Sequence, residues 1–187
     1  MMEVKSFTFN DYQENTYLVV KDGKCLIIDP GNYYDEENFT IKKFIDDNSL
    51  IPEFILITHV HIDHVLGIKY LSDEYSIDTF IPGSELDFHD NMINYASMFG
   101  SEKYSHQKNV KLIDETTQLN FQDIPLPVIF YLGEDLDHEK LTFFNTNFYP
   151  KAVAINNKQE LQIGIIDVND RELKAIELMK LMRNKSP

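Results

Sequence analysis

The stretch Thr58-His59-Val60-His61-Ile62-Asp63-His64 follows directly on Phe54-Ile55-Leu56-Ile57, an apolar run that predicts a buried strand. In an extended segment, residues two positions apart point the same way. His59 and His61 can therefore present their imidazoles to one point in space and share one metal ion. Imidazole suits zinc best, with iron and manganese as alternatives. The sequence thus predicts a metal site at the end of this strand.

Asp63 and His64 extend the predicted site. Asp63 continues the alternation, whereas we expect His64 to turn away at the start of a helix near residues 65–75. The two side chains could then serve a second ion close to the first. A histidine-rich surface loop is the alternative explanation, but a buried strand that leads into four ligand-type residues is the context that a hydrolytic metal centre needs. Gly67 has no side chain and would let the new helix pack close beneath the site.

The motif from His59 to His64 resembles the H-x-H-x-D-H motif of the metallo-β-lactamase superfamily, and the surrounding chain is similar to its glyoxalase II-like branch. Residues 7–9 and 13–20 resemble the family's opening hairpin, and residues 25–31 resemble its I-D-x-G strand end. The resemblance covers about residues 2–122.

This resemblance implies how the metal ligands divide. His59 and His61 would bind the first zinc, and Asp63 and His64 the second. Asp29 would lie beside the site and support it. The alternative role for Asp29 is a turn residue before Pro30-Gly31.

The rest of the family's ligand set has no matching motif in residues 123–187. The family supplies a third histidine from an H-x-P-G-H-like motif, a bridging aspartate from an S-G-D-like strand end, and one more histidine near its C-terminus. Glu134 or His138 could replace the third histidine, although an acidic run such as residues 134–137 is more often a solvated turn. Asp167 could replace the bridging aspartate, or it could belong to the N-cap region of the last helix.

The order of the predicted elements indicates an α/β fold. We expect strands near residues 3–9, 16–20, 24–29, 54–58, 110–113, 127–131, 141–145, 152–156 and 161–167, and helices near 36–48, 65–75, 84–99 and 170–183. Such an order suits a layered sandwich with helices outside two sheets. The resemblance implies the αββα sandwich of metallo-β-lactamases, with its second half shortened or rearranged.

Composition and length limit the other possibilities. A chain of 187 residues suits one domain over residues 1–187, with 1–122 family-like and 123–187 divergent. A hydrophobic content of 43% indicates a globular protein. The net charge of -14 opposes nucleic-acid binding, because a phosphate backbone would be repelled. Cys25 is the one cysteine, which fits a reducing compartment, and no apolar run could act as a signal core or membrane span, so we expect a cytoplasmic protein. We expect His89 and His106 to be surface residues.

Together these features predict a metal-dependent hydrolase, with one or two zinc ions as its cofactor. The metal would lower the pKa of a bound water to about 7, giving a metal-bound hydroxide, and polarise a substrate carbonyl. Asp63 is the expected catalytic residue, because it could bind a metal and orient that hydroxide. The resemblance implies a small thioester such as an acyl-glutathione, or an ester or lactone, as the substrate, and a homodimer is one option for the assembly.

Two other functions stay open. The chain could be a non-catalytic or weakly active relative with an incomplete metal site, acting as a binding or structural subunit; the missing motifs favour this reading. It could also be a flavodiiron-like or persulfide-handling protein with iron in the site, although no sequence feature selects iron over zinc.

Overall fold

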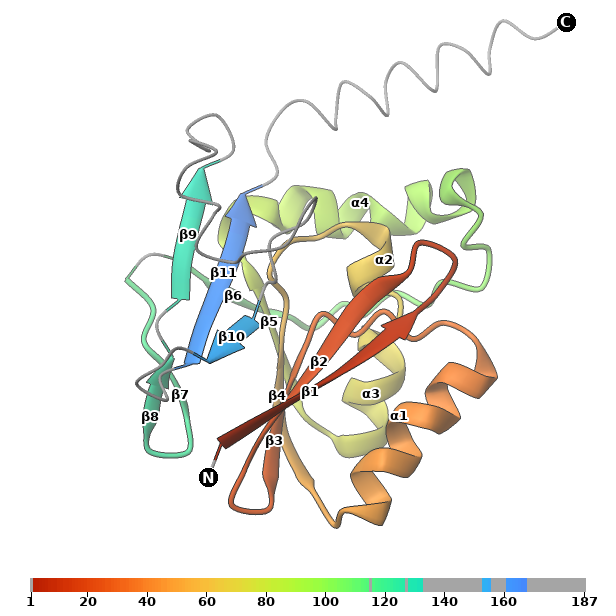
Figure 1. Cartoon of the computed structure of the whole chain (residues 1–187). Helices are drawn as coiled ribbons and strands as arrows, with labels where there is room; N and C mark the ends of the chain where they lie inside the picture. The colour runs from red at the N-terminus through yellow and green to blue at the C-terminus, as the bar shows by residue number, and fades with distance from the viewer. Residues whose placement is uncertain (1, 115, 127, 133–152, 156–160, 168–187) are drawn as a thin grey trace, which may run out of the picture.

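A six-stranded sheet forms the centre of the structure, a computed structural model that describes residues 2–114, 116–126, 128–132, 153–155 and 161–167 (Figure 1). Its strands are β1 (Met2–Phe9), β2 (Glu14–Lys21), β3 (Lys24–Ile28), β4 (Ile51–Leu56), β5 (Asp78–Pro82) and β6 (Lys111–Ile113), in that order across the sheet. β1, β2 and β3 pair antiparallel, and β3 to β6 pair in parallel. The carboxyl ends of β3, β4 and β5 therefore meet at one edge, where α/β proteins commonly place their sites.

Helices cover one face of this sheet. The described helices are α1 (Asp35–Asp47), α2 (Ile62–Val65), α3 (Ile68–Tyr75) and α4 (Leu86–Tyr95), with the 3₁₀ segments η1 (Gly83–Glu85) and η2 (Ala96–Phe99). Ile27 of β3 and Ile55 of β4 face this layer and share a core with Ile41 and Ile45 of α1. Within the described residues, none of these helices has the length and apolar character needed to cross a membrane.

The opposite face of the sheet is buried as well. Neighbouring residues of the same strands, such as Leu26, Ile28 and Leu56, form a second core with Phe121 and Leu126. The latter two belong to a hairpin of β7 (Leu119–Phe121) and β8 (Ile124–Leu126). Both faces of β3 and β4 are covered, which explains why these strands are apolar without alternation.

A second sheet lies on the side of the first sheet away from α1 and α3 (Figure 1). It contains β9 (Val128–Leu132), β10 (Val153–Ile155) and β11 (Leu161–Asp167), in the order β10-β11-β9. β11 is parallel to β9, and β10 is antiparallel to β11. The α/β sandwich with two sheets that the sequence predicts is confirmed. The expected strand at 141–145 and helix at 170–183 fall outside the described residues.

Some boundaries differ from the sequence prediction. β5 was not expected, because Asp78 and Pro82 are weak strand formers; it forms because β4 and β6 pair with it on both sides. The short β7 and β8 were also missed. The helix expected at 65–75 starts later, as α3 at Ile68, and is preceded by the separate turn α2 over Ile62–Val65. Between them, the N–H of Gly67 donates to the carbonyl of Pro30 at 2.8 Å. The expected helix at 84–99 is divided into η1, α4 and η2.

Candidate metal centre

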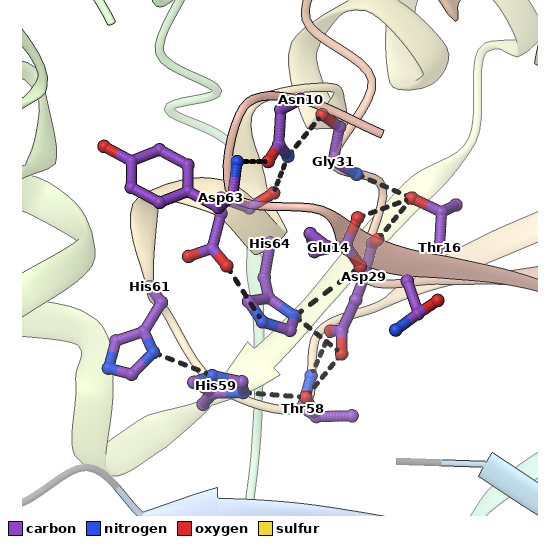
Figure 2. A network of polar contacts seen from close by, with 12 residues as sticks. Asn10, Glu14, Thr16, Asp29, Gly31, Thr58, His59, His61, Asp63 and His64 are labelled. Atoms are coloured by element: carbon purple, nitrogen blue, oxygen red, sulfur yellow. Dashed lines mark hydrogen bonds and ion pairs between the residues drawn. The ribbon is translucent and has the colours of Figure 1, made fainter. Parts of the chain in front are cut away.

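The histidine motif lies at the carboxyl end of β4, beside the end of β3 (Figure 2). The two strand ends are tied together, because the N–H of Asp29 donates to the carbonyl of Leu56 at 3.1 Å. Thr58 and Asp29 are completely buried, and the His59 side chain is almost so, with 7% of the residue exposed. The candidate ligands therefore start from a buried, hydrogen-bonded segment.

His59 and His61 face each other, as their spacing predicts. Nε2 of His59 lies 2.9 Å from Nδ1 of His61, and the two rings meet edge to face at an interplanar angle of 77°. Two nitrogens bound to one tetrahedral zinc, each about 2.0–2.1 Å from it, would lie about 3.3 Å apart. If these two nitrogens moved apart by a few tenths of an ångström, both could therefore bind the same ion.

A chain of hydrogen bonds fixes which nitrogen of His59 carries the proton. The Thr58 hydroxyl donates its single hydrogen to Oδ2 of Asp29 at 2.6 Å, and its oxygen lies 2.9 Å from Nδ1 of His59. The hydroxyl must therefore accept the N–H of Nδ1, which leaves the lone pair on Nε2, the atom that faces His61. Burial, together with His64 and His61, holds the pKa of His59 well below its usual value, so the ring is neutral and able to bind a metal at neutral pH.

His64 is held by the same aspartate from its other side. Its Nδ1 lies 3.1 Å from Oδ2 of Asp29, an ion-pair contact without hydrogen-bond alignment. Its Nε2 lies 3.4 Å from Oδ2 of Asp63, so these two atoms face one point. Burial acts to lower the pKa of His64, but the Asp29 carboxylate raises it and the net shift is upward.

The expectation that His64 turns away from the other histidines is wrong. The one-turn helix α2 starts after His61, and the N–H of His64 donates to the carbonyl of His61 at 3.1 Å. This turn brings the His64 ring back over His59, with ring centres 4.1 Å apart. The three imidazoles and the Asp63 carboxylate consequently form one cluster rather than two diverging pairs.

Asp29 combines both roles that the sequence left open. It has a positive φ of 49°, as a turn residue would, and it is fully buried against Thr58 and His64. Its Oδ1 accepts the backbone N–H of Thr58 at 2.7 Å. Both oxygens are thus engaged by residues around the site, and we assign Asp29 to supporting the ligands. Asp29, His59 and His64 also place one ligand atom each within 4.8 Å of one another.

Sequence reasoning missed two supporting residues in the β1–β2 hairpin. The Asn10 amide donates to the carbonyls of Gly31 at 2.9 Å and Asp63 at 3.0 Å. Glu14 is buried, and burial together with the Asp29 charge raises its pKa to about 10, so its carboxyl is neutral at pH 7. Asn10 lies in the hairpin turn and Glu14 is the first residue of β2, among several polar neighbours, so the sequence held no signal that distinguished them.

The glycines leave no room for side chains here. A Cβ at Gly31 would overlap the Glu14 carboxyl, and one at Gly67 would overlap the Asn32 side chain. The close packing beneath the site that Gly67 predicted is therefore confirmed.

The remaining sequence candidates lie elsewhere. Glu134 and His138 fall outside the described residues. Asp167 is the last residue of β11, where its backbone pairs with Leu132 of β9. The expectation that His89 lies on the surface is wrong, since it is fully buried, whereas His106, whose ring packs against that of His89, is partly exposed.

Comparison with known proteins gives consistent matches. Residues 9–140 match the family described as the metallo-beta-lactamase superfamily. The probable metallo-hydrolase YqgX of Bacillus subtilis (strain 168) is 28% identical over 122 residues, which cover 65% of this chain and 56% of that protein. A hydroxyacylglutathione hydrolase of Salmonella arizonae is 41% identical over 66 residues, covering 34% of this chain and 24% of that enzyme. The chain thus spans about half the length of the first relative and a quarter of the second.

Solved structures show the same fold. The B3 metallo-beta-lactamase BLEG-1 superposes with a TM-score of 0.58 at 20% identity, covering 70% of this chain and 72% of that one. TTHA1623, in a di-iron-bound form, gives a TM-score of 0.54 at 25% identity, covering 62% of this chain and 56% of that one.

Proposed function

The chain belongs to the metallo-β-lactamase superfamily, and on this premise we propose that it is a metal-dependent hydrolase with its metal held at the end of β4. The proposed ligands are His59, His61, Asp63 and His64. The observation that carries the proposal is the 2.9 Å approach of Nε2 of His59 to Nδ1 of His61, with the His59 lone pair directed there by Thr58 and Asp29.

The donor set fits a divalent transition metal. Three imidazoles and one carboxylate suit zinc first, with iron or manganese as alternatives. The di-iron form of TTHA1623 is a reason to test iron alongside zinc. When bound, such an ion lowers the pKa of a water molecule and polarises a carbonyl group.

The protein's own residues prepare this site in three ways. Asp29 and Thr58 hold His59 in the tautomer that can bind a metal, and Asp29 also orients His64. Support of this kind typically changes metal affinity by about 10–100-fold. The Asp63 side chain is 22% exposed, so water and substrate can reach its carboxylate, which would orient the attacking water.

We propose a small thioester as the substrate, with an ester or lactone as the alternatives. The similarity of part of the chain to hydroxyacylglutathione hydrolases supports a thioester. The alternative function, a weakly active or non-catalytic metal-binding relative, is favoured by the absence of an H-x-P-G-H-like motif from residues 123–187.

Metal analysis and a substrate panel together test the proposal. Purified protein is loaded with zinc or iron, and its metal content and its hydrolysis of an acyl-glutathione, a p-nitrophenyl ester and a lactone are measured. We expect His59→Ala to bind less metal than the wild type and to lose activity, and Asp63→Asn to lose most activity, whereas Asp73→Asn, on the exposed side of α3, should match the wild type. Full activity in Asp63→Asn, or metal binding unaffected by His59→Ala, would contradict the proposed site. A wild type that binds metal but hydrolyses nothing would favour the alternative.

A further inference from the structure

His89 is a buried histidine without a hydrogen-bond partner. It lies on α4, its exposed fraction is 0%, and neither Nδ1 nor Nε2 makes a hydrogen bond within the described part of the chain. Buried polar side chains are almost always satisfied, so an imidazole with two unpaired nitrogens needs an explanation. A ligand that binds one of these nitrogens would provide it.

Two further ligand-type side chains surround this ring. Oδ1 of Asp90 lies 3.5 Å from Nδ1 of His89, and the ring centre of His106 lies 4.5 Å from that of His89. One ligand atom from each of the three residues lies within 4.8 Å of the others. A distance of 3.5 Å is long for a hydrogen bond, but it is close to the separation of about 3.4 Å expected for a nitrogen and an oxygen on one tetrahedral zinc.

The state and orientation of the rings suit metal binding. Burial lowers the pKa of His89, assisted by His106, and burial also lowers the pKa of His106, so both rings are neutral at neutral pH. The hydroxyl of Tyr104, a buried residue, lies 3.1 Å from Nδ1 of His106 and orients that ring. Metal-bound histidines commonly have such a partner on the second nitrogen. The positive charge of Lys108 acts on His106 and would oppose a bound cation, and the negative charge of the Asp90 carboxylate acts in the opposite direction.

We propose that His89, Asp90 and His106 form a second metal site, which binds a divalent transition-metal ion such as zinc. Two imidazoles and one carboxylate are a common ligand set for such ions, with the remaining position open to water. The ion would join α4 to the segment between η2 and β6, which contains His106. The site shares no residue with the proposed catalytic centre, and the inference does not depend on the proposed function.

The proposed ion would also stabilise the loop of the first site, through Glu85. Glu85 immediately precedes α4, and its carboxylate accepts the backbone N–H of Val60, between His59 and His61. An ion that holds α4 in place would therefore also hold Glu85, which binds the loop between His59 and His61.

Zinc binding by the 187-residue chain tests the proposal. The protein is stripped with a chelator, reloaded with zinc chloride, desalted, and its zinc per chain measured by mass spectrometry. The double variant His59→Ala/His61→Ala removes two of the four proposed ligands of the first site, and substitutions at the second site then show whether the remaining zinc binds there. We expect this variant to retain one zinc per chain and to melt at a higher temperature with zinc than without it.

Substitutions at the second site complete the test. In the double-variant background, Asp90→Asn and His106→Gln should weaken zinc binding by roughly tenfold or more and abolish the rise in melting temperature. Asp87→Asn, an exposed carboxylate on the same helix, should change neither. The proposal is overturned if the double variant binds no zinc, or if Asp90→Asn and His106→Gln both bind zinc as tightly as Asp87→Asn does. All these variants share the same weakened first site, so their zinc affinities report on the second site. The two proposals can therefore fail separately.

Discussion

Replacement of Thr58 by valine should weaken metal binding without touching any proposed ligand. Valine has nearly the same shape as threonine but lacks the hydroxyl, which is fully buried and joins Asp29 to His59. The variant loses the 2.6 Å hydrogen bond to the Asp29 carboxylate and leaves Nδ1 of His59 without its 2.9 Å partner. The His59 proton is then free to move to Nε2, the nitrogen proposed to bind the metal.

The size of the effect follows from these two contacts. A hydrogen bond to a charged group contributes about 1.5–3 kcal/mol, and a buried nitrogen left unpaired costs about 1–3 kcal/mol. Because the two effects overlap, we expect the free energy of unfolding of the metal-free protein to fall by about 2–4 kcal/mol. Loss of a partner behind a metal-binding histidine should reduce metal affinity by about 10–100-fold.

Two measurements and two controls decide the outcome. Urea denaturation of the metal-free protein gives the stability, and competition against a zinc-binding dye gives the affinity. Thr58→Ser keeps the hydroxyl and should restore most of both. Thr79→Val removes a buried hydroxyl that has no partner in the described structure, and should not destabilise the protein. If Thr58→Val binds zinc as tightly as Thr58→Ser, the assignment of the His59 tautomer through Thr58 is refuted.

Three further outcomes are expected from other parts of the structure. The pKa of Glu14 is raised to about 10 in the folded protein, so its contribution to the stability of the metal-free protein is complete below about pH 4.5 and is lost as pH rises towards 10. Glu14→Gln should remove this pH-dependent loss of stability, and equal pH profiles of urea stability for the variant and the wild type would contradict the raised pKa. Gly67→Ala should lower the melting temperature because its methyl group overlaps Asn32, whereas Gly83→Ala, where the nearest atom is 3.4 Å away, should have a much smaller effect; equal melting temperatures would argue against the close packing. Phe121→Ala should cost about 3–5 kcal/mol in urea denaturation because the ring is fully buried, and a loss no larger than that of the exposed Phe39→Ala would show that the β7–β8 hairpin does not pack on the sheet.

Most strands of the central sheet, and the approach of His59 to His61, were predictable because their signals are local. The apolar runs of β3 and β4 mark buried strands, and the alternation of residues in an extended segment is enough to bring His59 and His61 together. The path of His64 was predicted wrongly because the one-turn helix α2 depends on contacts of its neighbours, among them the bond from Gly67 to Pro30.

The burial of His89 was missed for a different reason. Glu85, His89, Met92 and Ala96 are all buried and follow one another at helical spacing, so they form the inner face of η1, α4 and the start of η2. Two of these four residues are polar, and a search for apolar periodicity does not register such a face. Their partners, Val60 and His106, are distant in the sequence and become neighbours only in the folded protein.

The Asn10 side chain has a consequence for how this protein could change its metal preference. The proposed ligands lie within six consecutive residues, yet Asn10, 53 positions before Asp63, holds the backbone of that aspartate through the hairpin turn. Substitutions in the β1–β2 turn could therefore shift the Asp63 carboxylate by fractions of an ångström and leave the motif itself unchanged. A selection for iron instead of zinc, or for tighter binding, would best randomise this turn, a region that an inspection of the ligands alone would pass over.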